Sequence, residues 1–260
     1  MIAINAEQIL EIMSSYILPF ARLSGFLMTL SVISSRNIPA RFRMLLALAV
    51  TVIIVPVIPA YTGVDLFSFQ AFILVAEQSL IGIALGFVSR LMLETFVIGS
   101  QIIAMQSGLG FASLIDPANG NSVPALGQLF LMLTTLLFLS MNGHLIMIRL
   151  VVESFSSFPI GSSQSLAGMF WQLVNWTKWI FAAALVMAIV SIASLLIVNI
   201  AFGVMTRAAP QINVFAVGFP MTMLAGLILV WMSLSFFLPH FERQLSRSTL
   251  LICEMVQIEC

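Results

Sequence analysis

Residues 179–206 read WIFAAALVMAIVSIASLLIVNIAFGVMT and contain no Asp, Glu, Lys or Arg. A bilayer needs about 20 consecutive apolar residues per crossing helix, so this stretch alone predicts a membrane helix. Similar uncharged stretches cover residues 44–64, 95–115, 117–148 and 208–241. Two further stretches, 9–35 and 66–89, contain only isolated charges. The sequence therefore predicts an all-α integral membrane protein with six or seven helical arms.

The composition supports this fold class and excludes several functions. Hydrophobic residues make up 61% of the 260 residues and charged residues only 8%, against about 25% charged residues in soluble domains. Ten basic residues balance ten acidic residues, so no basic face is available for nucleic acid. Cys253 and Cys260 fit neither a disulfide framework nor a zinc site, and we interpret them as incidental thiols. We expect no cofactor and no metal.

Basic residues give conflicting information about the membrane topology. They are Arg36, Arg41 and Arg43 in the first loop, and Arg243 and Arg247 near the C-terminus. The positive-inside rule places both groups in the cytoplasm. The chain then starts outside and ends inside, which requires an odd number of membrane crossings. Six simple spans cannot satisfy both ends. Residues 95–115 are the stretch least suited to a plain helix, because Gly99, Gly108 and Gly110 each lower helix propensity by about 1 kcal/mol.

Several charged residues fall inside the apolar stretches. Arg90 with Glu94, and Arg149 with Glu153, are four residues apart, so each pair lies on one helix face and can form an ion pair. Other charges lack a partner nearby in the sequence, and we expect them to contact other subunits: Arg22, Glu77, Lys178 and Arg207. For Arg22, a snorkelling or locally hydrated position is the alternative to burial against another subunit.

Small residues mark places where helices can pack closely. Gly82 and Gly86 form a GxxxG motif, which serves equally for packing within the chain or between chains. A later stretch carries small residues at Ala182, Ala183, Ala184, Ala188, Ser191 and Ser194.

The stretch 99–128, GSQIIAMQSGLGFASLIDPANGNSVPALGQ, is the most informative for function. Its glycines loosen the helix, Asp116–Pro117 disfavours helix continuation, and Asn119–Gly120 favours a turn. Non-helical backbone at membrane depth is tolerated only inside protein or along an aqueous cavity. The stretch therefore suits a pore constriction, and a simple connecting loop is the alternative. No catalytic group accompanies the isolated His144 and His240, so an enzyme is not expected.

These residues resemble the FliR family of type III export-gate proteins. The resemblance rests on SRNIPARFR, EQSLIGIALGF, QSGLGFASLIDP, FLSMNGH, ESFSSFP and TRAAPQINVFAVGFP, which together extend from about Arg36 to Pro220. It implies a FliP-like region over residues 1–175, a FliQ-like hairpin over 176–240 and a short tail over 241–260. It further implies a subunit of the gate that assembles with FliP-type and FliQ-type subunits and exports unfolded flagellar proteins.

The resemblance also implies a plug in the central channel, formed by residues 106–122. Its members are Gln106, Gly108, Gly110, Phe111, Leu114, Ile115, Asp116, Pro117, Asn119 and Gly120. The expected location is the flagellar basal body in the bacterial inner membrane, with FlhA-type and FlhB-type export components as further partners. Two alternatives remain open at this point: the homologous subunit of a virulence secretion system, and a self-sufficient secondary transporter with a broken helix.

Overall fold

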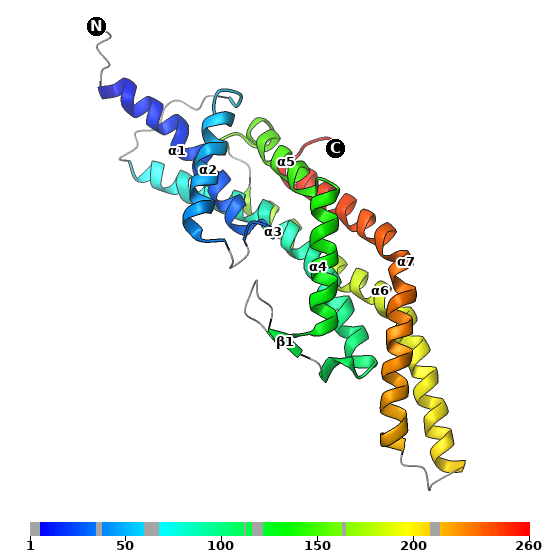
Figure 1. The fold of residues 1–260 in the computed structure, drawn as a ribbon. Coiled ribbons are helices and arrows are strands. Elements are labelled where there is room, and N and C mark those ends of the chain that lie inside the picture. The colour runs from blue at the N-terminus through cyan, green and yellow to red at the C-terminus, as the bar shows by residue number, and fades with distance from the viewer. Residues whose placement is uncertain are drawn as a thin grey trace. The chain divides into compact units, whose positions relative to one another are not determined.

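The computed structural model describes residues 6–34, 38–59, 68–111, 113–115, 122–162, 165–208 and 214–260. Seven α-helices account for most of this part of the chain, and one small two-stranded sheet interrupts them (Figure 1). The helices are α1 (Ala6–Thr29), α2 (Ala40–Ile54), α3 (Phe69–Gln106), α4 (Ala125–Ser140), α5 (Gly143–Ser157), α6 (Leu166–Ala208) and α7 (Val214–Val256). The all-α fold class is thus confirmed.

Two of the apolar stretches merge into one long helix. Residues 66–89 and 95–115 contribute to one continuous helix, α3, which passes through Gly99 and ends before Gly108. Among the described residues, three helices are long and apolar enough to cross a membrane: α3, α6 and the Val217–Val256 part of α7. The broken pair of α4 and α5 makes a fourth candidate. The expected six or seven helical arms thus correspond to seven α-helices, of which three, or four with the broken pair, are long and apolar enough to cross a membrane.

The chain divides into two compact units. The first consists of Met1–Arg90, Asn142–Trp176 and Arg247–Cys260, and the second of Leu91–Met141 and Thr177–Ser246. The division into residues 1–175, 176–240 and 241–260 remains a prediction.

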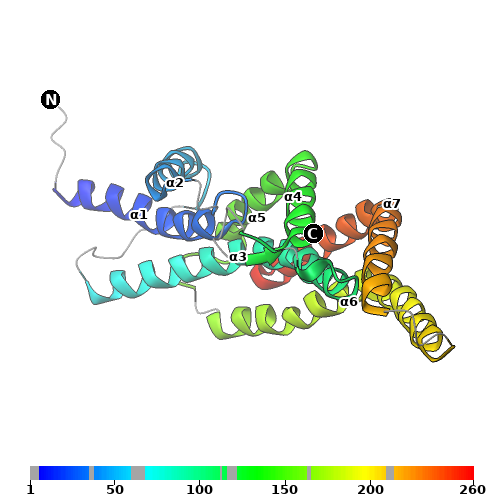
Figure 2. The ribbon, with the colours of Figure 1, turned by 60° about the horizontal axis from the view of Figure 1, so that its bottom comes forward.

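In the first unit, α1 and the first half of α3 lie side by side (Figure 2). The GxxxG motif makes this approach possible. A Cβ atom on Gly82 would overlap the carbonyl oxygen of Arg22, and one on Gly86 would lie 2.5 Å from the carbonyl oxygen of Phe26. Both neighbours are backbone atoms, which cannot move aside. The motif therefore serves packing within this chain.

Arg22 connects three helices of the first unit. Its side chain is fully buried, and Nε donates to Gln78 Oε1 at 2.8 Å. Nη1 donates to the carbonyl oxygen and to Oγ of Ser154, both at 3.0 Å, and Nη2 donates to the carbonyl oxygen of Phe158 at 2.9 Å. The guanidinium also lies over the Phe155 ring, with Cζ 4.2 Å from its centroid. Arg22 thus joins α1 to α3 and to the end of α5.

The position of these acceptors explains how the chain tolerates a buried cation. Carbonyl groups at a helix C-terminus lack partners within the helix and carry partial negative charge. Phe158, the residue that ends α5, supplies such a carbonyl, and the carbonyl oxygen of Ser154 one turn earlier accepts from Arg22 as well as from the Phe158 amide. The expectation that Arg22 awaits another subunit is therefore wrong, because the end of α5 within the same chain compensates its charge.

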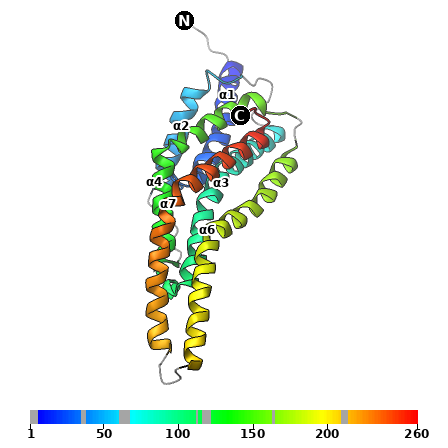
Figure 3. The ribbon, with the colours of Figure 1, turned by 90° about the vertical axis from the view of Figure 1, so that its right-hand side faces the viewer.

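The second unit combines the second half of α3, α4 and most of the α6/α7 hairpin. In this unit α6 and α7 run antiparallel (Figure 3). The buried face of α6 includes small residues at helical spacing, Ala184, Ala188 and Ser191. Gly99 of α3 meets this face, since a Cβ atom there would lie 3.2 Å from the carbonyl oxygen of Ala184. Small side chains therefore let the hairpin approach the α3 backbone.

Gly82→Ala should destabilise the first unit, because the added methyl group meets backbone of α1. Overpacking of this kind costs about 1–3 kcal/mol. Gly168→Ala in α6 is the matched control, since its Cβ atom would find its nearest neighbour at 3.9 Å. Thermal unfolding of the protein, extracted in detergent together with its partner subunits, measures both variants. Equal unfolding temperatures for the two variants would contradict the close α1/α3 contact.

Arg22→Met should also destabilise the first unit, although the side chain keeps its approximate length. The change leaves the buried acceptors on Gln78 and Phe158 without their donors, at about 1–3 kcal/mol for each unsatisfied group. Arg22→Lys should recover only part of the lost stability, because a single ammonium group cannot replace a planar guanidinium that donates to both α3 and the end of α5. Arg149→Met, at a side chain that is 79% exposed, is the control and should change the unfolding temperature little. Wild-type stability of Arg22→Met would refute the structural role.

Candidate functional site

The chain leaves α3 through a short left-handed turn. The last helical hydrogen bond runs from the Ser107 amide to the carbonyl oxygen of Ile103 at 3.0 Å. Gly108 follows with φ at 77°, a conformation that glycine adopts without the steric cost of a Cβ atom. A single turn of 3₁₀ helix, η1 (Leu109–Phe111), comes next. As the sequence predicts, helical structure gives way at Gly108; Gly99, however, lies well inside α3.

A small β-hairpin completes the segment. Strand β1 (Ser113–Ile115) pairs antiparallel with β2 (Ser122–Pro124), with Leu114 opposite Val123. Helix α4 begins at Ala125, directly after β2. Both ends of the segment are therefore attached to long helices: the first to α3 and the second to α4. We call residues 106–124 the channel loop.

The structure describes part of the expected plug. Gln106, Gly108, Gly110 and Phe111 lie at the base of the channel loop, and Leu114 and Ile115 belong to β1. Asp116, Pro117, Asn119 and Gly120 lie outside the described residues. The assignment of these positions to a plug remains a prediction.

An aromatic cluster holds together the helices that carry the channel loop. The ring centroid of Phe237 on α7 lies 5.3 Å from that of Phe96 on α3 and 5.3 Å from that of Phe130 on α4. His240 and Phe241 also contact Phe96, at 5.5 and 5.8 Å. Aromatic pairs at such distances contribute about 0.5–1.5 kcal/mol each beyond simple burial. Sequence analysis did not identify this cluster, although the i,i+4 spacing of Phe237 and Phe241 is a usable signal.

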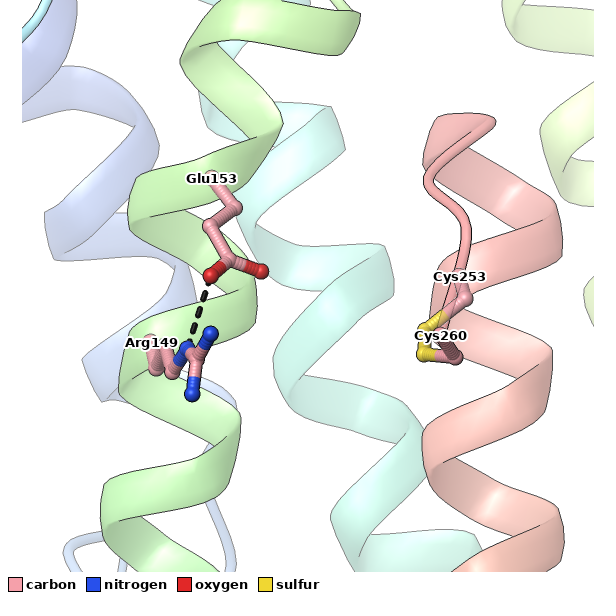
Figure 4. The surroundings of a disulfide bond; sticks show 4 residues. All are labelled: Arg149, Glu153, Cys253 and Cys260. Atoms are coloured by element: carbon pink, nitrogen blue, oxygen red, sulfur yellow. Dashed lines mark hydrogen bonds and ion pairs between the residues drawn. A yellow bond between two sulfur atoms is a disulfide. The ribbon is translucent and has the colours of Figure 1, made fainter.

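The two predicted charge pairs differ in what the structure shows. Nε of Arg149 lies 2.7 Å from Oε1 of Glu153, so this pair forms as its spacing predicts (Figure 4). Both side chains are exposed on the isolated chain, at 79% and 37%. Arg90 is exposed and Glu94 is half-buried, one turn apart on α3, and their pairing remains a prediction.

The remaining intersubunit candidates lie on the surface of the isolated chain. Lys178 and Arg207 are exposed on α6, and Glu77 is half-buried on α3. Arg207 occupies the last turn of α6, where the helix dipole favours a positive charge. Contacts of these three residues with other subunits remain predictions.

The cysteines correct one interpretation. Cys253 and Cys260 form a disulfide bond, with their Cα atoms 6.1 Å apart, so they are not incidental thiols (Figure 4). The cause is a C-terminal turn in which Gln257 adopts a left-handed φ of 57° and the Ile258 amide donates to the carbonyl oxygen of Cys253 at 2.9 Å. This Schellman-type reversal brings the end of the chain back along α7.

The described residues show no metal site and one small pocket. They contain no group of three His, Cys, Asp or Glu side chains that could hold a metal ion. One pocket, of about 140 Å³, lies between α6 and α7 and is lined by residues such as Met169, Gln172 and Glu254. Ligand sites usually measure about 300–1,000 Å³. This pocket is therefore small for a cofactor or a transported solute.

Comparison with known proteins assigns the family. Residues 13–248 match the model of the bacterial export proteins, family 1. The flagellar biosynthetic protein FliR of Escherichia coli is 35% identical, over 98% of each chain. FliR of Pectobacterium carotovorum is 31% identical over 95% of this chain and 94% of its own, and FliR of Bacillus subtilis is 28% identical over 88% and 89%.

These matches extend over nearly the whole chain and agree with the resemblance carried by its motifs. They make the chain a subunit of the flagellar export apparatus rather than an enzyme. The long apolar helices give it a membrane location within that apparatus. The chain is therefore a member of the bacterial export proteins of family 1, the family to which the FliR proteins belong.

Proposed function

We propose that this chain is a core subunit of the flagellar protein export gate, and that its channel loop closes the conduit for unfolded substrates at rest. It assembles with FliP-type and FliQ-type subunits in the inner membrane at the flagellar basal body. FlhA-type and FlhB-type components are further partners. The names of the relatives favour a flagellar system over the virulence alternative.

The observation that carries this proposal is the channel loop itself. The chain leaves α3 at Gly108, and strands β1 and β2 pair before α4 begins, so non-helical backbone follows one strongly apolar helix and precedes another. Such backbone is tolerated at membrane depth only within protein or beside an aqueous path. Apolar constrictions close pores by excluding water, which suits Phe111, Leu114 and Ile115. Glycines on either side of Phe111 allow the backbone to move when a substrate enters.

The surface of the isolated chain supports assembly with other subunits. Helix α6 carries exposed large apolar side chains from Trp171 to Val204, which corresponds to about 50 Å along the helix. The hydrocarbon core of a bilayer is only about 30 Å thick. Lipid alone therefore cannot cover this surface if α6 crosses as an ordinary span, whereas apolar helices of neighbouring subunits can.

Assembly is the first expected outcome. Co-expression with FliP-type and FliQ-type subunits should give a stable, monodisperse complex after detergent extraction, whereas the chain alone should aggregate or be degraded. Affinity purification followed by size-exclusion chromatography measures this difference. A monodisperse single chain that transports a solute in liposomes would overturn the gate proposal in favour of a secondary transporter.

Deletion of residues 110–120 should open the gate without preventing assembly, because η1 and β1 carry the apolar closure while α3 and α4 stay intact. Cells with the assembled variant should show increased ion conductance or small-molecule uptake. Co-purification with the partner subunits provides the assembly control. An assembled complex as tight as wild type would show that closure resides in another subunit.

A further inference from the structure

The first half of α7 contacts the base of the channel loop at two glycines. Gly226 of α7 faces Ser107, the residue that follows α3: a Cβ atom on Gly226 would overlap Ser107 Cβ and lie 3.1 Å from its Oγ. Ser107 is completely buried, and its Oγ already donates to the carbonyl oxygens of Ile103 and Ala104. Ser107 is therefore fixed between the end of α3 and the backbone of α7.

The second contact lies one residue further along the chain. The Phe219 ring of α7 covers Gly108, and a Cβ atom on Gly108 would lie 2.9 Å from Cε2 of that ring. Gly108 is the left-handed residue at which the chain turns out of α3. The ring thus lies directly against the backbone position about which the channel loop would have to move.

We propose that α7 seats the channel loop, with Phe219 and Gly226 as positioning residues that hold its base in the closed arrangement. This inference rests on the proposed function, because it assigns a support to the same closure. Gly226 lets the α7 backbone approach Ser107, and Phe219 blocks displacement at Gly108. Both residues act through the loop base and need not touch an exported chain.

The seat links the α6/α7 hairpin to the gate. The other arm of the hairpin contacts α3 as well, since a Cβ atom on Gly99 would lie 3.1 Å from Met187 Sδ of α6. The end of α3 is therefore in contact with both arms of the hairpin. A displacement of α7 that withdraws Phe219 from Gly108 would free the loop base, so the hairpin is the element through which gate opening can be controlled.

The test compares single glycine substitutions in the complete complex. Gly226→Ala adds a methyl group that displaces Ser107 and should raise ion leak above the wild-type level. Gly203→Ala is the matched control, because no atom of this chain lies within 4 Å of its added Cβ atom. Both changes are Gly→Ala within a hairpin helix. Co-purification with the partner subunits and ion leak in cells are measured together.

A second substitution that compensates for Gly226→Ala provides the decisive measurement. Ser107→Gly removes the side-chain atoms that Gly226→Ala would strike, leaving Ser107 Cα as the nearest remaining neighbour at 3.5 Å. The double variant Ser107→Gly/Gly226→Ala should therefore return leak to the wild-type level, whereas a general defect in folding would not be corrected. A double variant that leaks as much as Gly226→Ala would overturn the seat.

Phe219→Ala covers the case in which Gly226→Ala fails to assemble, because it removes atoms instead of adding them. It should increase leak in an assembled complex, and a tight Phe219→Ala complex overturns the seat. The deletion of residues 110–120 separates the two proposals. If the deletion variant leaks while Gly226→Ala and Phe219→Ala stay tight, the support of the loop base by α7 is refuted, and closure by the channel loop is supported. If the assembled deletion variant stays tight, closure by the channel loop is refuted.

Discussion

A guanidinium group without water must find its hydrogen-bond acceptors inside the protein, and the first unit depends on how this is achieved for Arg22. A charge inside a membrane protein costs at least about 3 kcal/mol when it lacks compensation. Here the hydrogen-bond acceptors come from carbonyl groups at the end of α5 and from Gln78 of α3. The requirement fixes α1, α3 and α5 relative to one another, and Gly82 allows the close approach that it needs.

The second unit solves a different problem, which is to hold a non-helical segment between apolar helices. Apolar side chains alone would not fix the relative positions of such helices, because lipid tails are as apolar as leucine side chains. Glycine contacts and an aromatic cluster supply specific positions instead. Gly99 and Gly226 fix α3 against the hairpin, and Phe237 joins α3 to α4. The channel loop therefore begins and ends on elements whose places are defined.

The length and the exposed apolar surface of α6 and α7 indicate a larger assembly. Helices that are apolar on every side are normally buried, in lipid or in protein. Helices α6 and α7 each contain 43 residues, about 65 Å of helix, which is twice the thickness of a hydrocarbon core. A subunit of a larger helical assembly satisfies both facts, because neighbouring helices can cover what lipid does not reach.

The sequence by itself determined the membrane class, the helical content, the Arg149–Glu153 pair and the loss of helix at Gly108, because these depend on composition and on neighbours within a few residues. Tertiary structure decided the rest. The acceptors of Arg22 lie 56, 132 and 136 residues away, and two of the four are backbone carbonyls, which the type of residue does not reveal. The disulfide depends on the left-handed turn at Gln257, and the seat of the channel loop depends on Phe219 and Gly226, far along the chain. Only the folded chain brings such groups together, because close packing selects partners by shape and distance and not by sequence separation.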